Sequence, residues 1–193
     1  EANTSGSTGK HVTVKIDAIS AAIGEALALR DHRWHGRDLG RKAAGIRAIK
    51  SGARAPHGKH EPRWAPSTGS GPLALLDVHT PVRDQLAWLE REAPSYLVTY
   101  PNNAAALIAE IEDQGTELPD LLELGTLGEV LPAGLRESCR RVLGVPLVDA
   151  YSTVELGYLA LQCPEHEHYH VQSEHVFVEI LRDDGAPCAI GES

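Results

Sequence analysis

Seven consecutive residues near the start of the chain have the composition of an anion-binding loop: Thr4, Ser5, Gly6, Ser7, Thr8, Gly9 and Lys10. Glycines let backbone N–H groups approach an anionic oxygen, hydroxyls donate hydrogen bonds to it, and a lysine adds a positive charge. The loop is not a Walker A motif, because Thr4 replaces its first glycine and His11 replaces the hydroxyl residue after the lysine. Composition alone leaves two interpretations open, a phosphate-binding loop and a plain Ser/Gly linker.

A second segment that could carry chemistry is Asp149–Glu155, which begins inside a short apolar run. It places the Glu155 carboxylate just beyond the carboxyl end of a predicted strand, where open α/β sheets bind ligands. Mg²⁺ in proteins commonly takes one or two carboxylates together with phosphate oxygens and water. Glu155 is therefore a candidate magnesium ligand, with a solvated turn glutamate as the alternative.

Gly128 and Glu129 form a third segment, between a predicted strand and a predicted helix. In order and spacing, the three segments closely resemble the signature motifs of the adenylate-forming enzymes, the superfamily of acyl-CoA synthetases, luciferases and peptide-synthetase adenylation domains. The resemblance implies that the loop closes over the β- and γ-phosphates of ATP. It also implies catalytic roles for Thr8, Lys10 and Glu155, the last as a Mg²⁺ ligand. Gly128 and Glu129 are implied to line the adenine pocket and Tyr151 to lie against adenine, while Ser152 and Thr153 are further implied nucleotide-binding residues.

Further segments resemble one group within that superfamily, the phenylacetate–CoA ligases and coenzyme F390 synthetases. They are Leu97–Asn102, Tyr151–Tyr158, Leu161–Pro164, Tyr169–Val171 and Val178–Ile180. The resemblance covers nearly the whole chain. It implies ATP-dependent activation of a carboxylic acid, of an aromatic type, to an acyl-adenylate, followed by transfer of the acyl group to coenzyme A.

Two positions depart from the family pattern. Val154 stands where many relatives carry Ser or Thr, so Ser152 or Thr153 would have to supply that hydroxyl. The loop ends in Lys10-His11-Val12, where relatives more commonly have x-Pro-Lys or x-Pro-Val, so His11 stands at the position of that proline. These departures slightly favour a competing hypothesis, in which the chain is a nucleotide-binding or interaction module that does not turn over an acid.

Polar residues after two predicted strands are candidates for binding the acid substrate. They are His79 after the first strand, and Tyr100 with Asn102 after the second. Asn102 is equally well explained as an ordinary helix cap. No histidine pairs with a Ser or Cys nucleophile in a recognised context, so the sequence gives no support to hydrolase chemistry.

The segment Cys163–His170 holds the densest set of metal-ligating side chains, with Cys163, His166, His168 and His170. Thiolate and imidazole are the ligands that zinc prefers, and zinc sites commonly use four of them. Strand alternation would place the three histidines on one face, away from the neighbours of Cys163. A polar loop that leads into a strand is the favoured interpretation, and a structural zinc is the alternative.

Composition and charge exclude several classes of protein. The formal charge is −9, which argues against a general nucleic-acid binder. The charge is uneven: residues 1–66 carry 12 basic and 6 acidic side chains, and residues 67–193 carry 6 and 21. A basic first third could face ATP or coenzyme A, or could be a solvated surface.

No signal peptide, membrane span or cysteine framework is present, so we expect a soluble, cytoplasmic protein that binds no membrane.

Apolar runs that alternate with helical patterns predict the fold. We expect strands at residues 73–78, 96–100, 121–127 and 146–150, and helices at 17–29, 39–49, 81–92, 104–114 and 132–144. Residues 51–72 are rich in Gly, Pro, Ser and Thr and predict a long mobile connection. Such alternation predicts an α/β fold with a mostly parallel sheet flanked by helices.

We assign residues 1–158 to a partial AMP-binding α/β domain of the adenylate-forming type. Residues 159–193 are expected to start a β-rich subdomain, with a hairpin turn at 183–185. The chain begins at Glu1 and contains no Met, which suits a fragment of a longer frame. Such a fragment, without the hinge and mobile C-terminal domain of the family, is expected to be nearly inactive alone. The sequence leaves the oligomeric state open, with a homodimer as one option.

Overall fold

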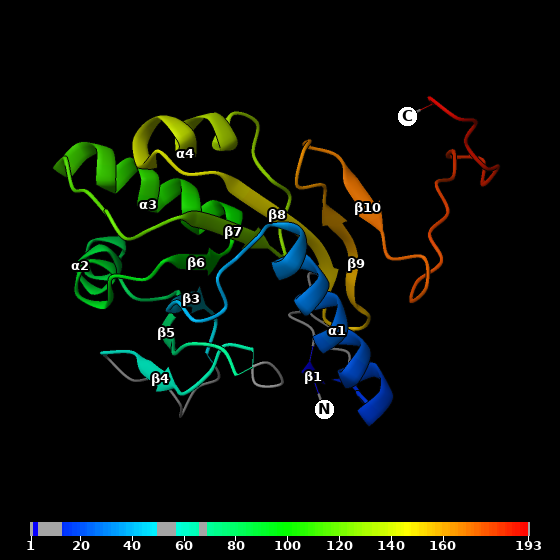
Figure 1. The fold of residues 1–193 in the computed structure, drawn as a ribbon. Coiled ribbons are helices and arrows are strands. Elements are labelled where there is room, and N and C mark those ends of the chain that lie inside the picture. The colour runs from blue at the N-terminus through cyan, green and yellow to red at the C-terminus, as the bar shows by residue number, and fades with distance from the viewer. Residues whose placement is uncertain (1, 4–12, 50–56, 66–68, 193) are drawn as a thin grey trace.

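The computed structural model describes residues 2–3, 13–49, 57–65 and 69–192, and they form one large sheet with helices on both faces (Figure 1). The helices are α1 (Ala18–Trp34), α2 (Val82–Glu92), α3 (Pro101–Gln114) and α4 (Leu135–Leu143). The strands of the large sheet are β3 (Ala43–Arg47), β4 (Lys59–Glu61), β5 (Leu73–Asp77), β6 (Tyr96–Thr99), β7 (Glu123–Leu127), β8 (Leu147–Thr153), β9 (Gly157–Gln162) and β10 (Tyr169–Val171). A separate pair of short strands, β1 (Ala2–Asn3) and β2 (Thr13–Val14), is antiparallel.

The order of strands in the large sheet is β10-β9-β8-β7-β6-β3-β5-β4. The five central strands, β8 to β5 in that order, run parallel to one another. Antiparallel strands complete both sides, β9 and β10 beyond β8, and β4 beyond β5. The expected α/β class with a mostly parallel sheet is therefore confirmed.

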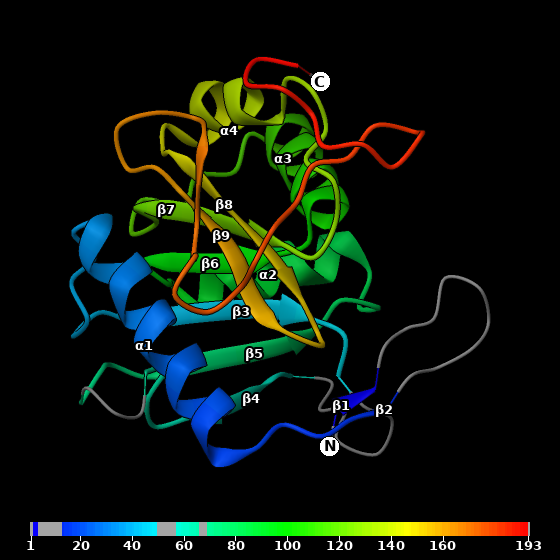
Figure 2. The ribbon, with the colours of Figure 1, turned by 90° about the vertical axis from the view of Figure 1, so that its right-hand side faces the viewer.

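Helices α2, α3 and α4 lie side by side on one face of the sheet, and α1 lies on the other (Figure 2). The three crossover helices each end at a residue in the left-handed conformation: Ala93, Gly115 and Gly144. This conformation stops a helix and turns the chain back toward the sheet. Between sheet and helices lies a core of fully buried side chains that includes Ile46, Leu76, Leu89, Leu124 and Cys139.

The predicted helix over residues 39–49 is wrong, because Ala43–Arg47 forms the central strand β3. Pairing with β5 and β6 on both sides decides the conformation, and it overrides the helix preference of Ala43 and Ala44. Gly45 fits a crowded position, since a Cβ there would lie 2.9 Å from Leu75 Cδ2. A strand that is buried on both faces has a continuous apolar pattern, which local periodicity does not separate from a helix.

Three smaller expectations also differ from the structure. Residues 59–61, within the predicted mobile connection, form β4, while 50–56 and 66–68 lie outside the described residues. The pair Thr80-Pro81 predicts an N-cap at Thr80 with proline at the first helical position. In the structure Pro81 is itself the N-cap of α2, and no side-chain capping bond forms. The alternating or apolar pattern of residues 175–181 predicts a strand before the turn, but residues 175–180 form none. The expected turn at 183–185 is present beside a bridge between Leu181 and Pro187.

The strands β9 and β10 continue the large sheet beyond residue 158. The proposed boundary between residues 158 and 159 stays a prediction. None of the helices in the described part of the chain has the length and apolar character that a membrane span requires.

A buried arginine joins α1 to the sheet. Arg37 donates from Nε to Glu123 Oε1 on β7 at 2.7 Å, and it also forms an ion pair with Asp31 of α1. Its Nη1 lies 2.8 Å from Nδ1 of His32, an arrangement that needs a neutral imidazole to accept the proton. Burial, and then the positive charge of Arg37, lower the pKa of His32 from 6.5 to about 4.

This environment predicts a loss of stability in mild acid. Between pH 6.5 and about 4 the unfolded chain binds a proton at His32 that the folded chain does not, so the free energy of unfolding falls as pH falls. We expect His32→Gln to reduce the difference between urea unfolding at pH 7 and at pH 4.5. The partly exposed His175, which lies outside this cluster, provides the matched control variant, His175→Gln. An equal pH dependence of the wild type and His32→Gln would contradict the assignment.

Candidate nucleotide-binding site

A cavity of about 520 Å³ lies at the carboxyl ends of β7 and β8. Its size falls within the range of about 300–1,000 Å³ that is typical of small-molecule sites. It is lined by Gly128, Glu129, Val130, Leu131, Asp149, Ala150, Tyr151, Ser152, Ala160, Tyr169 and Val171. The carboxyl ends of parallel strands are the usual ligand site of open α/β sheets, so the position agrees with the fold.

The turn after β7 forms one wall of the cavity. Gly128 has a φ of 81°, a left-handed value that glycine adopts without strain. Glu129 Oε2 accepts a hydrogen bond of 3.1 Å from the backbone N–H of Asn102, at the start of α3. A carboxylate at a helix N-terminus is favoured by the helix dipole. The predicted substrate residue Asn102 therefore lies directly beside this wall.

Tyr100 also borders the turn. A Cβ added at Gly128 would lie 3.5 Å from the Tyr100 ring, which is ordinary van der Waals contact. The Tyr100 hydroxyl accepts a long hydrogen bond of 3.4 Å from the backbone N–H of Ala48, just after β3. The structure thus brings two of the three predicted substrate residues, Tyr100 and Asn102, next to the predicted adenine site.

The third predicted substrate residue, His79, lies elsewhere. It follows β5, which is separated from β6 by β3, and it does not line the cavity. Its Nδ1 lies 2.8 Å from Oδ1 of Asp77. The described residues therefore do not bring His79 together with Tyr100 and Asn102.

A buried carboxylate forms the floor of the cavity. Asp149 on β8 accepts hydrogen bonds from the Thr126 hydroxyl at 2.6 Å and from the Tyr169 hydroxyl at 2.5 Å. The backbone N–H of Asp149 donates to Gln162 Oε1 at 2.8 Å. Burial, and then the bond to the Asp149 carboxylate, raise the pKa of Tyr169 to about 12, which keeps this phenol protonated.

The segment after Asp149 turns back into β9 as a tight hairpin. Tyr151, 59% exposed, and Ser152 line the cavity, whereas Thr153 and Glu155 do not. The backbone N–H of Leu156 donates to Thr153 Oγ1 at 3.1 Å, and this bond closes the turn. Glu155 is exposed and makes no hydrogen bond or ion pair with any other described residue. Its carboxylate is thus available to a ligand from solvent.

The predicted phosphate loop, Thr4–Lys10, lies outside the described residues. Its proposed contacts therefore stay predictions, including those of Thr8 and Lys10. The strands on either side of it, β1 and β2, pair with each other, and Figure 2 shows them on the side toward which β3 and β5 point.

Tyr169 and Val171 of β10 are cavity residues that the sequence argument missed. One signal was present, because Tyr169 lies between His168 and His170 and alternation places it on the opposite face. Which face meets the cavity depends on how β10 pairs with β9, and the sequence does not specify that pairing.

The chain matches no known protein-family model, and no curated protein matches it in sequence. Its fold, however, matches solved structures. The anthranilate CoA ligase AuaEII in complex with anthranoyl-AMP superposes with a TM-score of 0.73 at 16% identity, covering 97% of this chain and 36% of that protein.

Two other solved ligases give similar results. An open conformation of 2-hydroxyisobutyryl-CoA ligase in complex with 2-HIB-AMP and CoA has a TM-score of 0.68 at 13% identity, covering 97% of this chain and 44% of the ligase. A benzoate CoA ligase from Burkholderia xenovorans LB400 has a TM-score of 0.62 at 14% identity, covering 88% and 35%. The chain has the fold of part of these adenylate-forming ligases, and it spans less than half the length of each.

The bond between Tyr169 and Asp149 predicts a measurable titration. We expect the Tyr169 phenol to ionise near pH 12 and its pKa to fall toward 10 in Asp149→Asn, because the negative partner is removed while the burial remains. Tyrosinate absorbance during an alkaline titration reports this, with Tyr169→Phe to identify the signal. An unchanged titration in Asp149→Asn would show that the carboxylate does not control the phenol.

Proposed function

We propose that the cavity binds the adenine nucleotide of ATP and of an acyl-adenylate, and that the protein activates a carboxylic acid. One observation carries the proposal. Four residues that the family resemblance assigns to nucleotide binding line a single cavity although they come from two separate segments: Gly128, Glu129, Tyr151 and Ser152. The similarity in fold to solved acyl- and aryl-CoA ligases supports the same function.

In the proposed reaction a carboxylate oxygen attacks the α-phosphorus of ATP. The new bond joins that oxygen to the α-phosphorus. The bond between the α-phosphorus and the oxygen that bridges it to the β-phosphorus breaks, and pyrophosphate leaves with the electron pair. The protein contributes positioning and charge neutralisation. We assign these tasks to the loop Thr4–Lys10, with Thr8 and Lys10 on the phosphates, and to Glu155.

Mg²⁺ suits the Glu155 position. The Glu155 carboxylate is exposed and unpaired within the described residues, as a monodentate ligand of a phosphate-bound Mg²⁺ would have to be. When bound, the ion would offset the negative charge of the phosphates. The Thr153 hydroxyl accepts the Leu156 N–H and can still donate its own proton, so it could replace the hydroxyl that Val154 lacks.

The substrate class is the finer part of the proposal. The resemblance to the phenylacetate–CoA ligase group suggests an aromatic acid and coenzyme A as the acceptor. Tyr100 and Asn102, beside the Gly128–Glu129 wall, are proposed to contact the acid. For His79 only the sequence resemblance supports a substrate role.

The competing function is a nucleotide-binding module that does not activate an acid. One observation favours it: Val154, 46% exposed, presents an apolar side chain in the hairpin turn where a hydroxyl is expected to meet phosphate. Such a module would bind Mg·ATP in the same cavity and release it unchanged.

Nucleotide binding is tested at Tyr151. We expect Tyr151→Ala to weaken Mg·ATP binding roughly 5- to 10-fold, because the ring loses its stacking contact with adenine, while Tyr151→Phe stays near wild type. Phe177 is 87% exposed and lies outside the cavity, so Phe177→Ala is the matched control for losing an aromatic side chain. Titration calorimetry measures each affinity. Equal affinities of Tyr151→Ala and Phe177→Ala would reject the assignment.

Acid activation is tested by ATP–pyrophosphate exchange with a panel of aryl and aliphatic acids. The 193-residue chain is assayed beside the longest reading frame that contains it, and we expect exchange from the longer protein with one class of acid. Glu155→Gln is expected to lower the exchange rate by at least about 10-fold and to raise the Mg²⁺ requirement. Binding of Mg·ATP without exchange for any acid would favour the non-catalytic module.

A further inference from the structure

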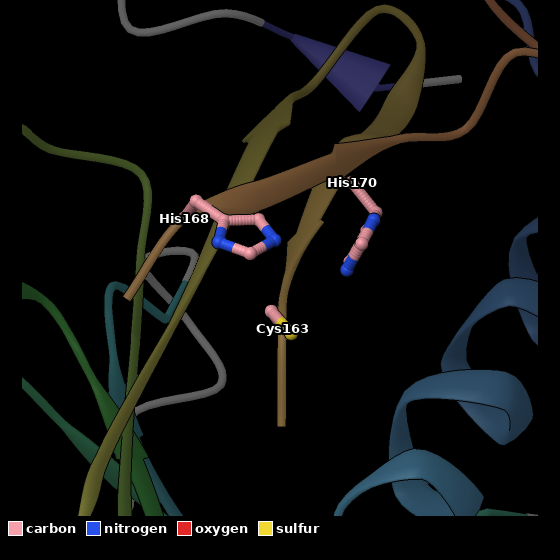
Figure 3. A group of neighbouring side chains, drawn as sticks. All are labelled: Cys163, His168 and His170. Carbon is pink, nitrogen blue, oxygen red and sulfur yellow. The ribbon is translucent and has the colours of Figure 1, made fainter. Parts of the chain in front are cut away.

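A thiol and two imidazoles meet at the loop end of the β9–β10 hairpin. Cys163 directly follows β9, His168 directly precedes β10, and His170 lies within β10 (Figure 3). One ligand atom from each of the three side chains lies within 4.8 Å of the other two. Strand alternation favoured a polar loop with the histidines apart from the neighbours of Cys163, whereas this convergence is what the alternative zinc interpretation requires.

The pairing of the two strands explains the convergence. The backbone N–H of Cys163 donates to the carbonyl of His168 at 2.8 Å, and Tyr169 pairs with Gln162. Cys163 and His168 are therefore opposite each other and share one face of the hairpin, and His170, two residues on, shares that face as well. The backbone register alone fixes this arrangement.

These three side chains have few other interactions. Within the described residues, neither imidazole makes a hydrogen bond, and neither does the Cys163 thiol. Cys139 provides a contrast, because its Sγ donates to the carbonyl of Val145 at 3.4 Å and its pKa is raised by burial to about 11. Cys139 is thus an inert core thiol, whereas Cys163 is buried beside two solvent-accessible nitrogen donors that no other group occupies.

We propose that Cys163, His168 and His170 form a zinc site that joins the two strands at the loop end of the β9–β10 hairpin. One thiolate and two imidazoles form a ligand set that binds zinc. Calcium and magnesium do not suit it, because they take oxygen ligands. Bond lengths of about 2.3 Å to sulfur and 2.0–2.1 Å to nitrogen put tetrahedral ligand atoms roughly 3.3–3.6 Å apart. The three ligand atoms now lie within 4.8 Å of one another, and rotation of the exposed imidazole side chains can shorten these distances to that value.

The fourth ligand comes from the same hairpin or from solvent. His166 stacks on His168 with ring centroids 5.5 Å apart, so its imidazole is close enough to complete a tetrahedral set. If His166 does not bind, a water molecule fills the position. With either fourth ligand, a metal ion can enter the site from solvent beside the exposed histidines.

The site would also hold one wall of the candidate nucleotide cavity. Tyr169, between the two histidine ligands, points to the opposite face, where its hydroxyl reaches Asp149 at 2.5 Å. Strand β10 has three residues, and among the described strands it pairs with β9 alone, so few bonds fix its position. A metal that joins both strands would fix the position of Tyr169. This consequence rests on the proposed function, whereas the zinc site itself does not.

Cobalt is the probe for the site. The 193-residue chain is stripped with a chelator and titrated with Co²⁺, and we expect one ion per chain, with a thiolate-to-cobalt band in the near ultraviolet and the visible bands of tetrahedral cobalt. One equivalent of Zn²⁺ should remove both sets of bands. The absence of stoichiometric binding, or octahedral cobalt without the thiolate band, would overturn the proposal.

Single substitutions identify the ligands. We expect Cys163→Ser to abolish the thiolate band, and His168→Gln or His170→Gln to weaken Zn²⁺ binding on the order of 100-fold. The matched controls are Cys188→Ser and His175→Gln, a partly exposed thiol and a histidine outside the cluster. Because both histidine ligands are exposed, we expect their variants to stay folded, and circular dichroism checks this. Equal losses in the controls would contradict the assignment.

The effect on the cavity is read separately. We expect the zinc-loaded chain to bind Mg·ATP more tightly than the stripped chain, and this difference to vanish in Tyr169→Phe. The cobalt spectra require no nucleotide, so a chain that binds cobalt as described but does not bind ATP would reject the proposed function and leave the zinc site standing.

Discussion

The buried carboxylate of Asp149 joins the strands on which the candidate site depends. Through its side chain it binds Thr126 on β7 and Tyr169 on β10, and through its backbone N–H it binds Gln162 on β9. A charge removed from water is tolerated only when hydrogen bonds surround it. Asp149 therefore requires the antiparallel strands β9 and β10 to lie where they do. The cavity exists because that requirement is met at the carboxyl ends of β7 and β8.

Much of the fold could be predicted because local signals agreed with the tertiary structure. The glycines at positions 115 and 144 cap the C-terminal ends of α3 and α4, so the predicted ends of these helices agree with the structure, whereas α3 begins at Pro101, three residues before the predicted start. Strand β3 was missed because Ala43 and Ala44 favour helix in isolation, and only pairing with β5 and β6 makes them extended. The failure thus fell on the central strand, where non-local contacts outweigh intrinsic preference most strongly.

The residues of the candidate site also fall into two groups, those that could be placed from the sequence and those that could not. Gly128, Glu129 and Tyr151 could be placed from sequence because their motifs follow strands directly, and strand ends in a parallel sheet meet at one edge. Tyr169 could not be placed, because its contact with Asp149 depends on the register between β9 and β10. The same register brings Cys163 to His168. A shift of one residue would reverse both faces of β10, so neither contact can be read from local periodicity.

The alternation of His168, Tyr169 and His170, at and just before the start of β10, has a thermodynamic consequence. Neighbouring residues face opposite sides, so an ion held by the two histidines and a nucleotide beside Tyr169 would act on the same short segment. Linkage between two ligands is reciprocal, and the factor by which the ion changes nucleotide affinity must equal the factor by which the nucleotide changes ion affinity. A strand of this kind would make metal retention depend on nucleotide occupancy, so the strength of ion binding would differ between the empty and the occupied protein.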